Sequence, residues 1–302
     1  MVLLLVDPLV SLFSNQGNEA NLQYGWQMAA VVIAIITVLF FLGCFSWTKE
    51  RVKPIKEQRN ALKDDIKDLL NNKPWWILLV AGIAAQIFNS IRDGAAIFYF
   101  KYYVESSYEF SLGFIDASWT LPTIYLVLGQ IFNIVGILCV TPLSCKIGKK
   151  NTYFYAMLFA TILNIAFYFM GKDDVIGIMV LQALISICAG CVFPLLWSMY
   201  ADIADYSEWR TGRRATGLIF SSSSMSQKFG WSIGGALTGW LLALFGFKAN
   251  MVQTEEAQYG IKLMLSLLPA IGTVLSVIFI GFYPLSDKKV SSITSELESK
   301  RH

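Results

Sequence analysis

Seven long apolar segments bounded by charged residues dominate this sequence and restrict the folds it can adopt. A helix needs about 20 apolar residues to cross the hydrocarbon core of a bilayer, and each segment reaches that length. A further apolar stretch at 1–13 is interrupted by Asp7 and Pro8 and is too short to span comfortably. We therefore predict an all-α integral membrane protein. The predicted spans are approximately residues 26–47, 75–103, 119–143, 152–171, 175–200, 215–247 and 261–285.

Composition excludes several other classes of protein. Charged residues make up 15% of the 302 residues, against about a quarter in soluble domains. The net charge of +3 provides no strongly basic face, so nucleic acid is not an expected partner. The single histidine, His302, is the last residue, which removes histidine-based metal sites and catalytic triads. We expect no enzyme, no metal site and no cofactor, and we interpret Cys188 and Cys191 as packing residues in preference to a redox pair.

Connections rich in lysine and arginine alternate along the chain with connections that are poor in them. This alternation predicts the orientation of the chain in the membrane. Four connections hold 18 of these residues, and the four alternate connections hold two. Because cytoplasmic loops retain positive charge, the rich connections and the C-terminus are expected to be cytoplasmic. The rich connections are 48–74, 144–151, 207–214 and 286–302.

The long charged segment divides the chain into two groups of predicted helices. Residues 1–47 are interpreted as the end of an N-terminal bundle, with the stretch at 1–13 as the back half of a helix. Residues 48–74 form a cytoplasmic loop with a predicted amphipathic helix, and 286–302 form a tail. Six helices over 75–285 after such a loop are typical of the second half of a twelve-helix carrier. The stripe of the amphipathic helix is Ile55, Leu62, Ile66 and Leu69.

Lys228 is the most informative single residue, because an ionisable group deep in the membrane is costly. It lies about 20 Å of helix rise into its span. Ser224 and Trp231 share its helix face at spacings of four and three, which would suit a sugar that hydrogen-bonds and stacks on a ring. The alternative is a lysine held by a buried carboxylate of another helix, with a role in assembly only.

A second polar face and a second group of candidates lie on other predicted helices. Asn89 and Asp93 lie on one face of the 75–103 span, and Arg92 is adjacent. Counting along the helix puts Arg92 and Asp93 towards the outer mouth, where both could instead snorkel to the interface. Gln130 and Asn133 form either a polar lining or an interhelical hydrogen bond. The predicted substrate-binding residues are Lys228, Ser224, Trp231, Asn89, Asp93, Gln130, Asn133 and Trp197.

A dense group of charges closes the 175–200 span on its cytoplasmic side. This group is either a solvated loop or an inner gate built from salt bridges. The paired glycines 230/234 and 235/239 allow close helix packing or sliding, which the sequence does not distinguish. The predicted gate residues are Asp202, Asp205, Tyr206, Glu208, Arg210 and Arg213.

The same region resembles a known family. The run from Ala201 to Ser221 has the pattern Asp-x-x-Asp-Tyr-x-Glu followed by Gly-x-Arg, and continues to Lys228 and its glycines. It is similar to the glycoside-pentoside-hexuronide:cation symporters, the melibiose-carrier branch of the major facilitator superfamily. The Ile-Gly-Lys-Lys turn ending at Lys150 and the Tyr283-Pro-Leu segment also resemble this family. The resemblance covers essentially the whole chain, in register with part of family helix five to helix twelve.

This resemblance implies sugar uptake coupled to Na⁺, H⁺ or Li⁺ by alternating access. Lys228 matches the membrane lysine of family helix eleven, and Asp202 and Arg213 match its inner-face motif. The family's cation-ligating carboxylates lie on its first, second and fourth helices, which have no counterpart here. We therefore expect a truncated carrier in the inner membrane that does not transport alone, with a sugar, the bilayer and a separate N-terminal half as partners. The alternatives are a module that docks with such a half, or a lipid or oligosaccharide flippase.

Overall fold

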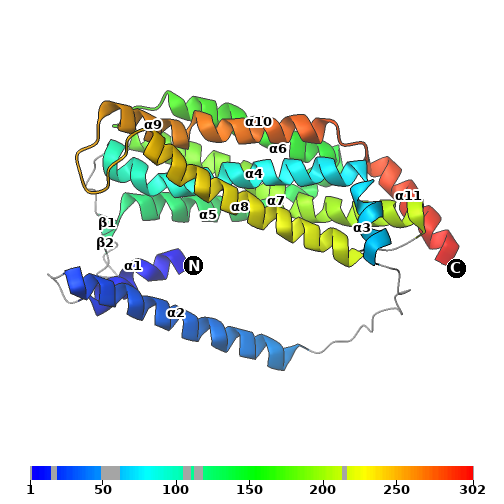
Figure 1. Cartoon of the computed structure of the whole chain (residues 1–302), viewed down its shortest axis with the longest axis horizontal. Coiled ribbons are helices and arrows are strands. Elements are labelled where there is room, and N and C mark those ends of the chain that lie inside the picture. The colour runs from blue at the N-terminus through cyan, green and yellow to red at the C-terminus, as the bar shows by residue number, and fades with distance from the viewer. Residues whose placement is uncertain are drawn as a thin grey trace. The chain divides into compact units, whose positions relative to one another are not determined.

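The computed structural model describes residues 2–14, 19–48, 62–104, 110–111, 118–212 and 216–301. The chain divides into two compact units, of which the first comprises Met1–Arg59 and Ser107–Val127. The second comprises Asn60–Ser106 and Leu128–His302 and holds both groups of charged side chains discussed below. Figure 1 shows the elements with their labels.

The first unit contains two helices and a short strand pair. Helix α1 (Val2–Phe13) packs on α2 (Glu19–Trp47), where a Cβ added at Gly25 would lie 2.8 Å from the Val10 carbonyl oxygen. Strands β1 (Phe110–Ser111) and β2 (Ser118–Trp119) pair antiparallel. Large apolar side chains towards the end of α2 are exposed, which suits a lipid-facing surface.

The second unit is a bundle of helices. Across both units, the described residues contain five helices that are long and apolar enough to cross a membrane, and each coincides with one of the seven predicted spans. These helices are Gln23–Trp47, Lys73–Val104, Leu121–Ile147, Val175–Thr211 and Glu255–Gly281. Helices α6 and α8 occupy the other two positions, and their assignment as spans remains a prediction. Helix α5 (Leu121–Ile147) begins in the first unit and continues into the second from Leu128. The other helices of the second unit are α3 (Leu62–Leu70), α4 (Lys73–Tyr99), a π-helical turn (Phe100–Val104), α6 (Lys149–Tyr168), α7 (Val175–Thr211), α8 (Thr216–Leu244), α9 (Glu255–Leu265), α10 (Leu267–Gly281) and α11 (Asp287–Arg301).

Polar side chains begin three of these helices. Asn72, Asp174 and Thr254 precede α4, α7 and α9, and each side chain accepts a hydrogen bond from a backbone N–H in the first turn. Such caps satisfy donors that have no partner within the helix. Helix α3 lies within the predicted loop at 48–74, whereas Ile55 of its predicted stripe lies outside the described residues.

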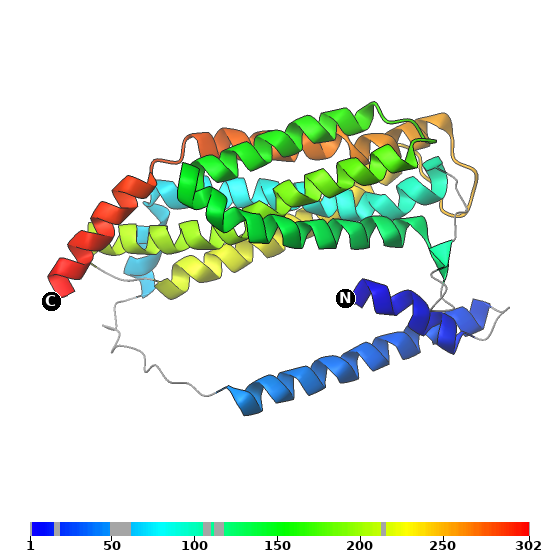
Figure 2. The same cartoon turned by 180° about the vertical axis from the view of Figure 1, so that it is seen from behind.

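Helix α4 is the central element of the second unit and packs on α8, α10 and α9. Figures 1 and 2 show α4 running between α8 and α10. The contact with α8 is parallel and depends on small residues, because a Cβ added at Gly234 would lie 2.5 Å from the Ser90 Cβ. A Cβ at Gly235 would meet nothing within 4 Å. Gly234 is therefore a packing residue, and Gly235 lies on the open face of α8.

Two helix boundaries differ from those predicted. Helix α7 continues past residue 200 to Thr211, so the predicted gate residues up to Arg210 are helical and do not form a loop. The last predicted span, 261–285, is not continuous, because α9 ends at Leu265 and α10 begins at Leu267. Ser266 between them has φ −122° and ψ −90°, which is not a helical conformation.

Candidate functional site

The predicted lysine lies on the side of α8 that faces away from α4. Lys228 is exposed and Trp231 is 47% exposed, whereas Gly230 between them contacts the side chain of Gln86 on α4. Ser224, one turn before Lys228, is half-buried. Among the described residues no carboxylate lies within ion-pair distance of Lys228. Both the substrate-binding role of Lys228 and the alternative of a role in assembly remain predictions.

The predicted polar face of α4 contacts α8 only in part. Gln86 is buried against Gly230, and Ser90 donates a hydrogen bond to the Trp231 carbonyl at 3.0 Å. Asn89 is half-buried and donates to the carbonyl of Ala85 in its own helix. Asp93 is half-buried. No contact between described residues joins Asn89 or Asp93 to Lys228, so the structure does not bring these candidates together.

The remaining substrate-binding candidates are separate from these two faces. Gln130 is exposed and Asn133 is half-buried on α5. On α7, Trp197 stacks on Phe220 of α8 with ring centroids 5.9 Å apart. Its indole Nε1 is buried and has no hydrogen-bond partner among the described atoms.

The prediction that Arg92 could snorkel to the interface is wrong. Its side chain is only 3% exposed and lies among helices α4, α6, α7 and α9. It donates to Asn164 Oδ1, Gln182 Oε1 and the Leu265 carbonyl oxygen, each at 2.7 Å. The guanidinium also lies 5.1 Å from the centroid of the Phe167 ring, where a cation is attracted to the π-face. We call Arg92, Asn164, Gln182 and Leu265 the arginine cluster.

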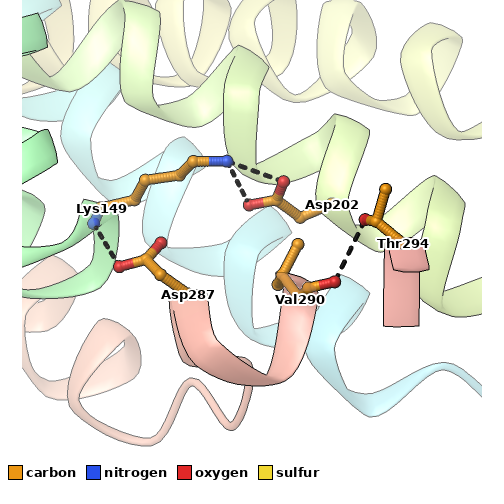
Figure 3. A network of polar contacts seen from close by, with 5 residues as sticks. All are labelled: Lys149, Asp202, Asp287, Val290 and Thr294. Carbon is orange, nitrogen blue, oxygen red and sulfur yellow. Dashed lines mark hydrogen bonds and ion pairs between the residues drawn. The ribbon is translucent and has the colours of Figure 1, made fainter. Parts of the chain in front are cut away.

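A second charged group, the lysine cluster of Lys149, Asp202 and Asp287, joins α6, α7 and α11. Lys149 Nζ donates to both carboxylate oxygens of Asp202 at 2.7 Å. Its backbone N–H donates to Asp287 Oδ2 at 3.1 Å. Figure 3 shows that Lys149 contacts α7 through its side chain and α11 through its backbone N–H.

The residues beside Lys149 extend this group of contacts to α10. Lys150 Nζ donates to the carbonyl oxygens of Gly281 and Tyr283 at 2.8 and 2.7 Å, at the end of α10 where the helix dipole favours a cation. Gly148 has φ +89°, and a Cβ there would collide with the Asp287 carboxylate. The Tyr283 side chain is buried, and its hydroxyl has no hydrogen-bond partner among the described atoms.

The predicted gate residues are only partly represented in the lysine cluster. Asp202 is 9% exposed and pairs with Lys149, which is not one of the predicted gate residues. The alternative of a solvated loop is therefore wrong for Asp202. Arg210 donates to the Asn71 carbonyl at 3.2 Å. Tyr206 stacks on Trp209, and Lys289 of α11 lies 5.9 Å from the Tyr206 ring. Asp205 and Glu208 remain untested as gate residues, and Arg213 lies outside the described residues.

Possible metal ligands and thiols add no further site. The described residues contain no group of three histidine, cysteine, aspartate or glutamate side chains that could hold a metal ion. Cys188 is half-buried, while Cys191 is buried and donates to the Gly136 carbonyl at 3.4 Å. These contacts are those of packing residues.

The long apolar helices indicate a helical, multi-pass membrane protein. Residues 1–287 match the family described as MFS/sugar transport protein. The chain belongs to this family, which confirms the resemblance drawn from its sequence. Its curated relatives are carriers and symporters and are not enzymes.

Three similar proteins illustrate the relationship. The glucuronide carrier protein homolog of Escherichia coli K12 is 30% identical over 275 residues, which cover 90% of this chain and 57% of the relative. The isoprimeverose transporter of Lactiplantibacillus pentosus is 31% identical over 296 residues, covering 97% and 58%. The putative glycoside/cation symporter YagG of E. coli K12 is 28% identical over 295 residues, covering 97% and 61%. The chain thus spans 57–61% of the length of these three relatives.

Proposed function

We propose that this chain forms one wall of a sugar:cation symporter that takes a glycoside, pentoside or hexuronide together with Na⁺ or H⁺. The relatives named for glucuronide, isoprimeverose and glycoside/cation transport support this substrate class. The observation that carries the proposal is the open face of α8. It presents Lys228, Trp231 and Gly235 along one side of a helix whose other side is packed on α4.

This face also supports the proposal that a second group of helices completes the pathway. An ammonium group at membrane depth requires water or a polar partner, because exposure to acyl chains is costly. Helices 75–285 would then form the C-terminal bundle, residues 1–47 the end of an N-terminal bundle, and the C-terminus would be cytoplasmic in the inner membrane. On this proposal, the 302 residues alone do not transport, and the rest of the N-terminal bundle is the expected partner.

The proposed substrate-binding residues fall into two groups: those on the open face of α8 and those on neighbouring helices. Lys228 supplies a charged donor, and Trp231 supplies a ring for the apolar face of a sugar. Ser224 shares that face of the helix. Asn89, Asp93, Gln130, Asn133 and Trp197 remain proposed lining residues on three neighbouring helices.

The test is uptake of labelled glycosides by cells that express either the 302 residues or a fusion preceded by the N-terminal helices of the glucuronide carrier homolog. We expect cation-dependent uptake by the fusion and none by the 302 residues. Lys228→Ala should lower uptake by the fusion at least about tenfold. Lys262→Ala is the matched control, because Lys262 lies 4.9 Å from the Tyr168 ring and has its own aromatic partner.

Each contrary outcome removes a specific part of the proposal. Unchanged uptake in Lys228→Ala would remove the role of the α8 face. Uptake by the 302 residues alone would refute the need for a second wall. Lipid or oligosaccharide translocation by the fusion without any sugar uptake would favour a flippase.

A further inference from the structure

The last membrane segment contains a break that its sequence explains. Pro269 lies in the first turn of α10 and has no N–H, so it cannot donate to the carbonyl four residues earlier, which is that of Leu265. The proline ring also crowds that carbonyl, and the helix is interrupted at Ser266. The Leu265 oxygen therefore lies at the end of α9, where the partial negative charge of the helix is concentrated.

Arg92 supplies the donor that Pro269 cannot. Its Nη1 lies 2.7 Å from the Leu265 oxygen and 2.7 Å from Asn164 Oδ1, and its Nη2 lies 2.7 Å from Gln182 Oε1. The three oxygens are neutral and come from three different helices, α9, α6 and α7. A planar fork of donors suits this arrangement better than a single ammonium group does.

One of the two amide oxygens is oriented by a hydrogen bond that does not involve Arg92, and the other belongs to a side chain for which Gly129 leaves space. Asn164 Nδ2 donates to the Ala160 carbonyl of its own helix at 2.6 Å, which directs Oδ1 towards the arginine. Gln182 Nε2 lies against Gly129 of α5, where an added Cβ would be 2.6 Å away. Gly129 therefore leaves the space that this side chain needs. The Asn164 hydrogen bond and the break at Ser266 therefore position two of the three oxygens through features other than their contacts with Arg92.

In transporters, carbonyl groups exposed where a membrane helix is broken often coordinate a cation. We propose that the Leu265, Asn164 and Gln182 oxygens form a binding site for a guanidinium-type cation, which this chain fills with its own Arg92. The tethered cation stabilises the break at Ser266 and connects α4 to three other helices. This inference concerns the folded bundle and does not depend on the proposed transport activity.

The test uses the 302-residue chain in detergent, with thermal unfolding followed by tryptophan fluorescence. Arg92→Ala should lower the melting temperature by roughly 10 °C, because it leaves buried acceptors without a donor. Millimolar guanidinium chloride should restore at least half of the loss, whereas equal concentrations of NaCl or neutral, planar urea should not. The wild-type protein, in which the site is filled, should not respond.

Three results would overturn the proposal. If guanidinium stabilises Arg92→Ala no more than urea does, there is no site for a guanidinium-type cation. If NaCl stabilises this variant as well as guanidinium does, the three oxygens bind inorganic cations instead. If Arg92→Lys melts at the wild-type temperature, the planar fork of donors is unnecessary.

A second variant keeps the test valid if Arg92→Ala does not fold. Pro269→Ala restores an N–H to the chain and can satisfy the Leu265 carbonyl within a continuous helix. The combination of Arg92→Ala with Pro269→Ala should therefore fold and lose less stability than Arg92→Ala alone. Pro194→Ala in α7 is the matched control, because it changes a helix proline that lies about 18 Å along α7 from Gln182. Equal rescue by both proline variants, or failure of the combination while Pro269→Ala folds, would contradict the proposal.

Discussion

The arginine cluster and the lysine cluster both connect several helices through one cation, but they solve different electrostatic problems. Arg92 is 3% exposed and donates to three neutral oxygens. Lys149 and Asp202 form an ion pair in which their side chains are 30% and 12% exposed. The first group is inside the bundle, and the second is at its end, where α11 meets α6 and α7.

The difference shows how exposure determines what holds a charge. A carboxylate that is buried with a cation must itself be desolvated, and that cost can exceed the attraction. Neutral amide and carbonyl oxygens can solvate a buried guanidinium at a lower cost. A partly exposed pair keeps some hydration, so it costs less to form and contributes less when formed. We therefore expect the two clusters to respond differently to substitution and to salt.

The largest effect is expected in the arginine cluster. Asn164→Leu removes one acceptor from a buried guanidinium and should lower the free energy of unfolding by about 3 kcal/mol. Asn89→Leu is the matched control, because Asn89 is half-buried and, among the described residues, its side chain bonds to the Ala85 carbonyl of its own helix. Thermal unfolding of both variants in detergent measures the contrast. Equal losses would show that Asn164 acts through packing alone.

The next effect concerns the turn that positions the lysine cluster. Gly148→Ala should cost about 2 kcal/mol, because φ +89° is unfavourable for alanine and its Cβ would displace Asp287. In an Asp287→Ala background the collision is absent and only the backbone cost remains. The loss from Gly148→Ala should therefore be smaller there, when melting temperatures are compared in a double-mutant cycle. Additive losses would mean that Asp287 does not constrain this turn.

Much of this fold could be predicted from the sequence because membrane helices have a strong local signal. Five of the seven apolar runs coincide with helices that meet the length and hydropathy requirement. Apolar length does not show where a span is interrupted, so it predicts a continuous helix over 261–285. Pro269 within that run was the available clue, since a proline leaves the carbonyl four residues earlier without a donor.

The candidate site was less predictable because its contacts join residues far apart in the chain. Polar spacing on one helix identified Asn89 and Asp93, but it could not show that the neighbouring Arg92 turns towards α6, α7 and α9. The dense charges near the end of α7 identified Asp202, whereas its partner Lys149 lies 53 residues earlier. Helical spacing describes which residues share a face, and only the packing of helices shows what that face meets.

A smaller effect is expected when the partly exposed Lys149–Asp202 pair is broken. Asp202→Asn should cost about 1 kcal/mol, because the Lys149–Asp202 pair is partly hydrated. Asp205→Asn, one turn along the same helix, should cost less, since no ion pair to Asp205 is formed among the described residues. Melting temperatures of the two variants provide the measurement. A loss as large as that of Asn164→Leu would contradict the distinction between the clusters.

The smallest expected effect is a change with salt concentration in the stability cost of these substitutions, which should differ between the two clusters. Raising NaCl from about 0.1 M to about 1 M shortens the screening length from about 10 Å to about 3 Å. The cost of Asp202→Asn should then fall by about half, because the pair that it breaks is already weakened in the wild-type protein. The cost of Asn164→Leu should not change, since solvent ions do not reach a guanidinium that is 3% exposed. Melting temperatures of the wild type and both variants at the two salt concentrations test this, and a parallel response would mean that burial does not distinguish the two clusters.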